Sequence, residues 1–310
     1  MTTPVLDLWR VSEPARSAPL LAVADAATPG ASVLLMNAVL LAGLVGAVVT
    51  VVRVRVWRPA TLRRGPERRL DLTHADRVIG AGLVGMIVIG AVMGARVSDA
   101  AADPAAAQAA AMVSSLGLIG SAVFFLVKAW QTTPAGLRSA GLLPRRPGRD
   151  LVVGLAGFVV GTLFTWATLA AVAAAARAGG SDVPEVNHTL LEQLGREPTL
   201  AAVTQLVGIA VLMGPLLEEV VFRGLLQTLL IDTLGRRFRW TAVLIAAAVF
   251  ALIHAGAVSW HGWPGLFVLG LVLGWLYERT GSLLPCYLAH ALFNAANIAM
   301  AVGMSKATAG

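Results

Sequence analysis

The chain has little charge and almost no cysteine. Only 13% of its 310 residues are Asp, Glu, Lys or Arg, which is about half the share of an ordinary soluble domain, whereas 57% are hydrophobic. This balance excludes an ordinary soluble globular protein and is typical of a polytopic helical membrane protein. The single cysteine, Cys286, excludes an intrachain disulfide and a metal cluster held by several cysteines.

Two common protease and hydrolase signatures are also missing. The sequence contains no HExxH, which excludes the zinc-protease helix that carries two histidines and a glutamate. It contains no GxSxG, which excludes the nucleophile elbow of serine hydrolases. The first 30 residues lack a basic start followed by a sustained apolar core, so we do not expect a cleaved signal peptide.

The apolar runs predict an all-α fold, namely a polytopic transmembrane bundle. A spanning helix needs about 20 apolar residues, and eight segments meet this requirement. The expected spans are 32–52, 78–95, 107–129, 151–175, 199–222, 240–258, 263–280 and 283–303. The apolar pattern of the fifth continues, so we expect its helix to run on to about residue 234.

The basic residues follow the expected spans. Alternate loops and their flanks hold 17 of the 24 Lys and Arg residues. The positive-inside rule therefore predicts a multi-pass protein of the cell membrane with these loops in the cytoplasm and both termini outside. Topology thus accounts for the net charge of +7, and we expect the lipid bilayer as a partner and no nucleic acid.

Three charges interrupt the fifth span in the stretch GPLLEEVVFRG. A charged side chain at the bilayer centre costs about 3 kcal/mol on insertion scales, so these charges must pair or meet water. Glu219 and Arg223 are four residues apart and can pair on one helix face. Glu218 then points about 100° away and is left over. Pro215 predicts a bend that makes room for water beside these groups.

Two later spans carry further polar groups. The stretch FALIH places Phe250 and His254 four residues apart, and HALFNAAN places His290 and Asn294 on one helix face. A single histidine in a membrane helix often only makes an interhelical hydrogen bond. Because intramembrane ionisable groups face the bundle interior or a cavity, we expect both histidines and Asn294 to converge with Glu218 on one polar chamber.

This set of residues suits hydrolysis by activated water. A desolvated glutamate can act as general base, and a neighbouring histidine can orient the water. A histidine and an asparagine can donate hydrogen bonds to an oxyanion. Two alternatives remain open from the residue types: a Cys286–His290 nucleophile pair, and a divalent metal such as zinc held by Glu218, His254 and His290.

Taken together, the motifs EExxxR, FxxxH and HxxxN resemble the CAAX prenyl endopeptidase and bacteriocin-processing (CPBP, or Abi) family of intramembrane proteases. The resemblance covers residues 199–300 and implies a membrane-embedded CAAX protease-like domain over 151–310, preceded by a region of three helices and basic loops over 1–150. It implies no cofactor. The roles that it implies are water activation by Glu218 and His254, an oxyanion hole of His290 and Asn294, and support from Glu219, Arg223 and Phe250.

The expected function is therefore an intramembrane endopeptidase that acts on a membrane-associated protein or peptide. The Ala-, Arg- and Gly-rich composition is typical of a bacterial chain from a GC-rich genome. One alternative is a bacteriocin-immunity or binding membrane protein that has the same fold and no turnover. A second is a proton-coupled transporter, because Glu and His inside membrane spans also form proton relays.

Overall fold

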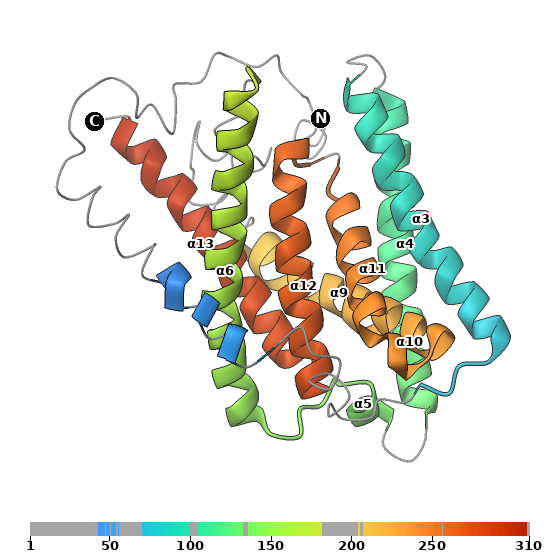
Figure 1. Cartoon of the computed structure of the whole chain (residues 1–310). Helices are drawn as coiled ribbons and strands as arrows, with labels where there is room; N and C mark the ends of the chain where they lie inside the picture. Colours follow the sequence, from blue (N-terminus) through green and yellow to red (C-terminus); the bar gives the residue numbers. More distant parts are fainter. Residues whose placement is uncertain are drawn as a thin grey trace.

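The structure is a computed structural model that describes residues 43–46, 48–49, 51–53, 55, 70–99, 104–132, 136–181, 204, 207–255 and 257–308. The principal elements within these ranges are all helices, which confirms the predicted all-α class (Figure 1). They are α3 (His74–Asp99), α4 (Pro104–Gln131), α5 (Gly136–Ser139), α6 (Pro147–Ala178), η2 (Val207–Met213), α9 (Gly214–Glu219), η3 (Val220–Gln227), α10 (Thr228–Leu234), η4 (Arg236–Phe238), α11 (Arg239–Leu252), η5 (Trp260–Gly262), α12 (Trp263–Thr280) and α13 (Leu284–Thr308).

Local sequence signals set several of these helix ends. α3 begins with a capping box, in which Thr73 Oγ1 accepts from the Asp76 N–H at 3.2 Å and Asp76 Oδ2 accepts from the Thr73 N–H at 2.8 Å. α6 and α12 each carry a proline in the first turn, Pro147 and Pro264, where a missing N–H costs nothing. α12 ends at Gly281, whose φ of 66° is a left-handed conformation that glycine adopts without strain.

The helices form two groups, and the segment that carries Glu218 and Glu219 lies between them (Figure 1). α3 and α4 pack against each other as a hairpin, and α6 packs on both α12 and α13. The segment from η2 to α10 lies between these groups, because η3 contacts α3 and α4 on one side and α11 and α12 on the other. The larger hydrophobic core cluster of the described residues joins them, with Val84 and Phe125 from before residue 150 and Phe222, Phe250 and Tyr277 from after it.

α6 presents glycines to its neighbours. A Cβ atom on Gly157 would lie 2.5 Å from Leu276 Cδ1, and one on Gly154 would lie 3.1 Å from the Pro285 Cα. Residues without side chains let two membrane helices approach closely. α12 and α13 therefore pack closely against α6 at these glycines.

Among the residues that the structure describes, three helices are long and apolar enough to cross a membrane: His74–Arg96, Ala105–Gln131 and Pro147–Ala178. The predicted count of eight spans is not confirmed. α11 has 14 residues, which at 1.5 Å each give about 21 Å, whereas the hydrocarbon core of a bilayer is about 30 Å thick. α12 has 18 residues and its last turn carries Glu278 and Arg279, which lower its hydropathy. The first expected span, 32–52, lies mostly outside the described residues.

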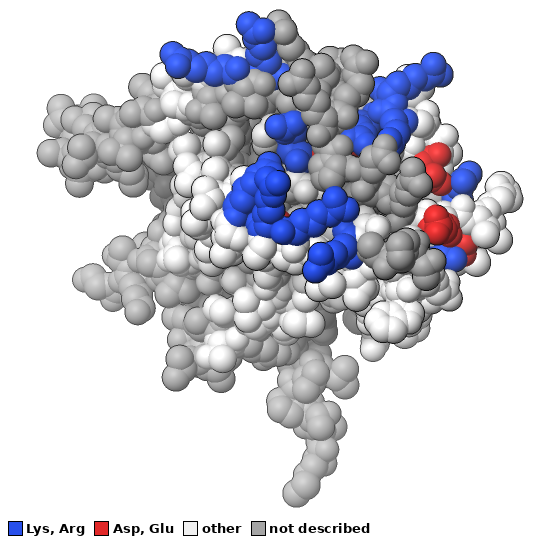
Figure 2. Space-filling view, turned by 90° about the horizontal axis from the view of Figure 1, so that it is seen from below, with Lys and Arg blue, Asp and Glu red and all other residues white. Residues whose placement is uncertain are grey.

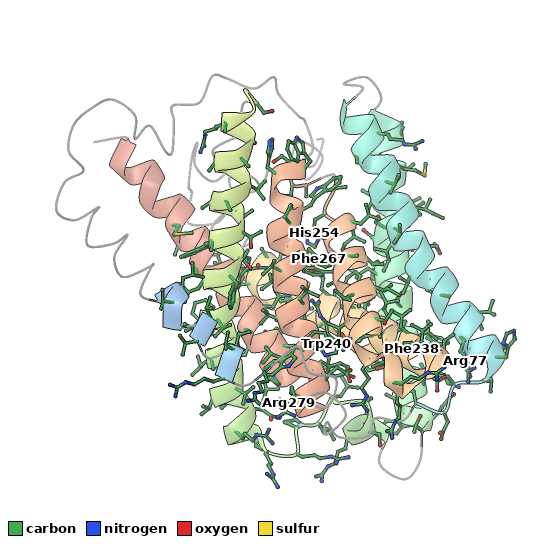
Figure 3. The ribbon with its side chains drawn as sticks, in the orientation of Figure 1. Arg77, Phe238, Trp240, His254, Phe267 and Arg279 are labelled. Atoms are coloured by element: carbon green, nitrogen blue, oxygen red, sulfur yellow. The ribbon has the colours of Figure 1, made fainter. Side chains whose placement is uncertain are left out.

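Lys and Arg side chains gather at one end of the bundle (Figure 2). Acidic partners hold two of them, since Arg77 Nε lies 2.9 Å from Asp232 Oδ2 and Lys128 Nζ lies 3.0 Å from Asp76 Oδ2. Arg77 and Arg279 both lie at this end although they come from distant parts of the chain (Figure 3). The clustering agrees with basic loops on one side of a membrane, and the assignment of that side to the cytoplasm stays a prediction.

Candidate active site

The two glutamates lie on a short α-helical piece between two π-helical pieces. η2 and η3 are π-helices, and the six residues of α9 separate them. π-helical turns are rare and occur frequently at functional sites, because the wider turn shifts side chains relative to an α-helix. Glu218 and Glu219 are the last two residues of α9, so they sit where the helix changes its hydrogen-bond register.

Pro215 gives this register change a chemical consequence. In a π-helix the carbonyl of one residue accepts from the N–H five residues later, and the position five residues after Ala210 is Pro215, which has no N–H. The Ala210 carbonyl instead accepts from Asn294 Nδ2 on α13 at 2.8 Å. A carbonyl can only accept, so the amide nitrogen of Asn294 faces it and keeps a second hydrogen for another partner.

Glu219 is the centre of a buried charged cluster. Its Oε1 accepts from Arg223 Nη1 at 2.9 Å, which is the ion pair that the four-residue spacing predicts. The same oxygen lies 2.8 Å from Nδ1 of His290. The side chains of Glu219 and Arg223 are each only 1% exposed, and Arg223 Nη2 also reaches the Gly270 carbonyl at 3.4 Å. These contacts fix His290 on α13 to the helix that carries the glutamates.

Glu218 faces both histidines. Its Oε2 lies 3.8 Å from His290 Nε2 and 4.0 Å from His254 Nε2. This oxygen is buried and accepts no hydrogen bond from any residue that the structure describes, although the side chain as a whole is 20% exposed. Both separations are too long for a direct hydrogen bond. Glu218 is therefore the glutamate that stays available, as the spacing predicted.

The outer contacts of the histidines determine their protonation pattern. His254 Nδ1 lies 2.8 Å from the Phe250 carbonyl, and His290 Nδ1 lies 2.8 Å from the Glu219 carboxylate. Both of these oxygens accept hydrogen bonds, so each Nδ1 must carry a hydrogen. In the neutral form of either ring, Nε2 is then an acceptor that faces the Glu218 carboxylate. Glu218 Oε2 and the two Nε2 atoms are then three acceptors that face one another. This arrangement suits a hydrogen-bond donor such as water.

The Phe250 ring contacts both histidine rings. Its ring centroid lies 5.0 Å from that of His254 and 5.6 Å from that of His290, and the Arg223 guanidinium lies over its face at 4.6 Å. It also meets Phe222 edge-on at 5.5 Å. Contacts of this kind stabilise aromatic clusters and hold a cation over a ring. Phe250 thus locks the orientation of both imidazoles and of the arginine.

Other polar residues of these helices are used elsewhere. Asn297 Nδ2 donates to the Phe293 carbonyl of its own helix at 2.8 Å. The Cys286 thiol is buried and lies 3.3 Å from the Leu273 carbonyl, so it points into the packing between α12 and α13. Sequence reasoning missed the Ala210 carbonyl, because its hydrogen bond with Asn294 joins two segments that are far apart in the sequence.

The metal alternative concerns Glu218, His254 and His290. Their Nε2 and Oε2 atoms are chemically suitable ligands, and Nδ1 hydrogen bonds of the observed kind orient metal-binding histidines. Over the described part of the chain, no group of three or more His, Cys, Asp or Glu side chains is arranged to hold a metal ion.

Residues 200–296 match the family model of type II CAAX prenyl endopeptidase Rce1-like proteins. Over these residues, called the Rce1-like segment below, the chain is similar to that family. The Rce1-like segment contains all three motifs, from EExxxR to HxxxN, and so confirms the family resemblance stated above. Comparison with curated proteins and with solved structures returns no match. The family name, CAAX prenyl endopeptidase, suggests a membrane protease. α3, α4 and α6 lie outside the matched segment.

Proposed function

We propose that this protein is an intramembrane endopeptidase that hydrolyses a peptide bond in a membrane-associated protein or peptide. The observation that supports this most directly is the position of Glu218 Oε2, 3.8 Å from His290 Nε2 and 4.0 Å from His254 Nε2. Groups at this separation are too far apart to bond directly and close enough to share one water molecule. The family match supplies independent support for peptide-bond chemistry.

In the proposed first step, Glu218 takes a proton from water held between it and His254. The His254 ring carries its hydrogen on Nδ1, so its Nε2 accepts the second hydrogen of the same water and orients the oxygen. The water oxygen attacks the carbonyl carbon of the substrate, and the carbonyl electron pair moves to its oxygen. The product of this step is a tetrahedral oxyanion.

His290 and Asn294 are the proposed donors to that oxyanion. His290 donates through Nε2 when its ring carries both protons, and Glu219 lies at 2.8 Å to balance the resulting charge. Glu218, Glu219, Arg223 and the charged His290 then sum to zero, which lowers the cost of burying them. Asn294 uses one amide hydrogen on Ala210 and retains the other.

The second step returns the proton. The protonated Glu218 delivers its hydrogen to the amide nitrogen of the substrate, the oxyanion electron pair reforms the carbonyl, and the carbon–nitrogen bond breaks. The products are a carboxylic acid and an amine, and no covalent enzyme intermediate forms. Each residue is used as its contacts allow, because Glu218 accepts no hydrogen bond from the described residues and can carry the proton in both steps.

The test of the proposed function compares peptide termini in native membranes that contain either the wild-type protein or Glu218→Gln at equal levels. We expect new termini that depend on Glu218, and their sequences would identify the substrate. Repeating the comparison with a chelator decides the metal alternative, since activity through Glu218 and the histidines alone would persist. Identical termini in the two membranes would refute proteolysis and leave the binding or immunity alternative.

Asn294 and Asn297 provide a matched pair on one helix. Replacing Asn294 with alanine is expected to lower the cleavage rate by about 10²- to 10³-fold, which is the usual effect of removing one oxyanion donor. Asn297 Nδ2 donates to the Phe293 carbonyl of its own helix, so Asn297→Ala is expected to leave the rate nearly unchanged. Cleavage rates of the two purified variants on the identified substrate test this. Equal rates would remove Asn294 from the mechanism.

A further inference from the structure

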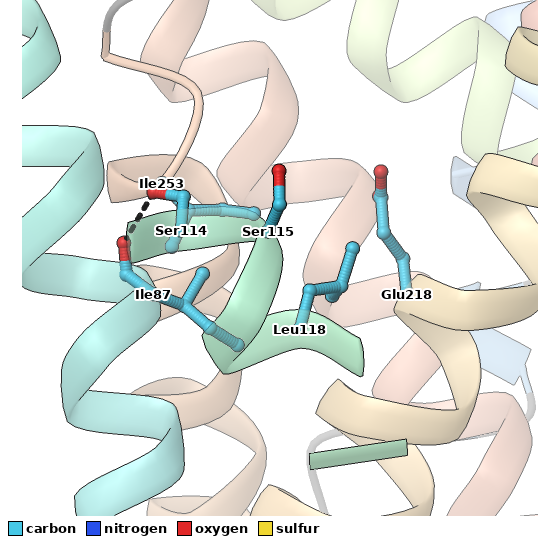
Figure 4. A pocket seen from close by; sticks show the side chains of 6 residues that line it. All are labelled: Ile87, Ser114, Ser115, Leu118, Glu218 and Ile253. Carbon is cyan, nitrogen blue, oxygen red and sulfur yellow. Dashed lines mark hydrogen bonds between the residues drawn. The ribbon is translucent and has the colours of Figure 1, made fainter. Parts of the chain in front are cut away.

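A cavity of about 130 Å³ lies directly beside Glu218 (Figure 4). Its walls come from α3, α4, α9 and the residue that follows α11, so most of it lies outside the Rce1-like segment. The lining residues are Ile87, Ser114, Ser115, Leu118, Glu218 and Ile253. Three of these six belong to α4, the second helix of the hairpin whose role sequence reasoning did not assign.

The two serines of α4 have different surroundings. Ser114 Oγ donates to the Ile87 carbonyl at 3.1 Å. α3 packs tightly there, because a Cβ atom on Gly90 would lie 2.4 Å from Ser114 Oγ. Ser114 is thus part of the α3–α4 contact. Ser115 is exposed and makes no hydrogen bond with any described residue. Figure 4 shows its hydroxyl and the Glu218 carboxylate pointing in the same direction.

A substrate at this site must bring residues into the pocket. The carbonyl that is attacked has to lie next to the water on Glu218, so a side chain flanking that carbonyl enters the space beside Glu218. An extended peptide inside a membrane protein also needs partners for its backbone groups, and a serine hydroxyl offers one donor and two acceptor sites. Ser115 is the group on this wall that is available for that purpose.

The walls restrict what the pocket accepts. Ile87, Leu118 and Ile253 are apolar, and the Glu218 carboxylate repels an acidic side chain. An engineered protein cavity of about 150 Å³ holds one benzene molecule, so a cavity of this size holds one side chain of similar bulk. The pocket therefore suits a single neutral side chain.

From these observations we infer that Ser115 is a specificity-determining residue, which contacts the substrate beside the bond attacked at Glu218. Ser115 lies on α4, so a helix outside the Rce1-like segment then limits the size of the substrate side chain. This inference rests on the proposed function and adds a residue and a substrate restriction to it.

Peptide termini in native membranes test this inference, with the wild-type protein and three variants at equal levels. Ser115→Leu fills the pocket and is expected to shift the Glu218-dependent cleavage sites toward smaller flanking residues. Ser115→Gly widens the pocket and is expected to shift the sites toward larger ones, so a folding defect in one variant does not decide the result. Ser115→Ala keeps the size preference and is expected to lower cleavage about 3- to 10-fold through the lost hydrogen bond.

The control sits on the same helix. Ala109→Leu adds similar bulk at an exposed position that does not line the pocket. It is not expected to change which residues flank the cleavage sites. Glu218-dependent termini that stay the same in Ser115→Leu and Ser115→Gly would overturn the inference and leave proteolysis standing. The absence of such termini from wild-type membranes would overturn both.

Discussion

Purified Glu218→Gln protein is expected to cleave its substrate about 10²- to 10⁴-fold more slowly than the wild type, the range that general-base catalysis contributes. Glutamine has the shape of glutamate and cannot take a proton from water at neutral pH. The water would still bind, so the loss should appear in kcat and leave KM nearly unchanged.

The same variant is expected to keep its stability. Glu218 Oε2 accepts no hydrogen bond from the described residues, and the side chain is 20% exposed, so little is lost when its charge is removed. Thermal denaturation in detergent beside the rate measurement separates the two effects. A midpoint that falls together with the rate would show that Glu218 is structural, and a rate that stays within a few-fold of the wild type would refute its role as base.

The neighbouring glutamate is expected to behave in the opposite way. Glu219→Gln removes the carboxylate that holds Arg223 at 2.9 Å and His290 at 2.8 Å, and it leaves a buried guanidinium without its charge partner. Breaking one side of a buried ion pair costs about 3–5 kcal/mol. We expect a correspondingly large fall in the free energy of unfolding, measured by thermal or denaturant unfolding in detergent.

A double variant tests the cause of that loss. Glu219→Gln combined with Arg223→Met removes both charges and is expected to recover part of the stability, because replacing a whole buried pair is much less costly than breaking it. Losses that simply add in the double variant would show that the two side chains act independently. Adjacent glutamates would thus have separate effects, one on rate and the other on stability.

The sequence allowed much of this site to be predicted because its helices are regular and its charges are few. Four-residue spacing was enough to pair Glu219 with Arg223 and to leave Glu218 unpaired. The cost of charge in lipid was enough to expect His254 and His290 near the same place. These inferences use only the geometry of a single helix and the polarity of the surrounding medium.

Features that depend on contacts between distant segments could not be predicted in this way. Nothing in the local pattern indicates that Glu219 also holds His290, or that Ala210 accepts from Asn294, since both bonds join α13 to the helix of the glutamates. Ser115 gave no signal either, because a serine in an apolar helix has the same pattern whether it packs or lines a pocket. The predicted count of eight spans is not confirmed for another reason: hydropathy also finds apolar helices such as α11 that are short for a bilayer.

The glycine face of α6 also bears on when the protein becomes active. α6 is made before α12 and α13, and its surface is shaped to receive both of them through Gly157 and Gly154. Under the proposed mechanism, a nascent chain that has been synthesised only as far as Glu218 still lacks His254 and His290, and α13 has not yet been made. If the proposed function holds, the growing chain is inert toward neighbouring membrane proteins and becomes active only when α13 packs against a helix that is already in place.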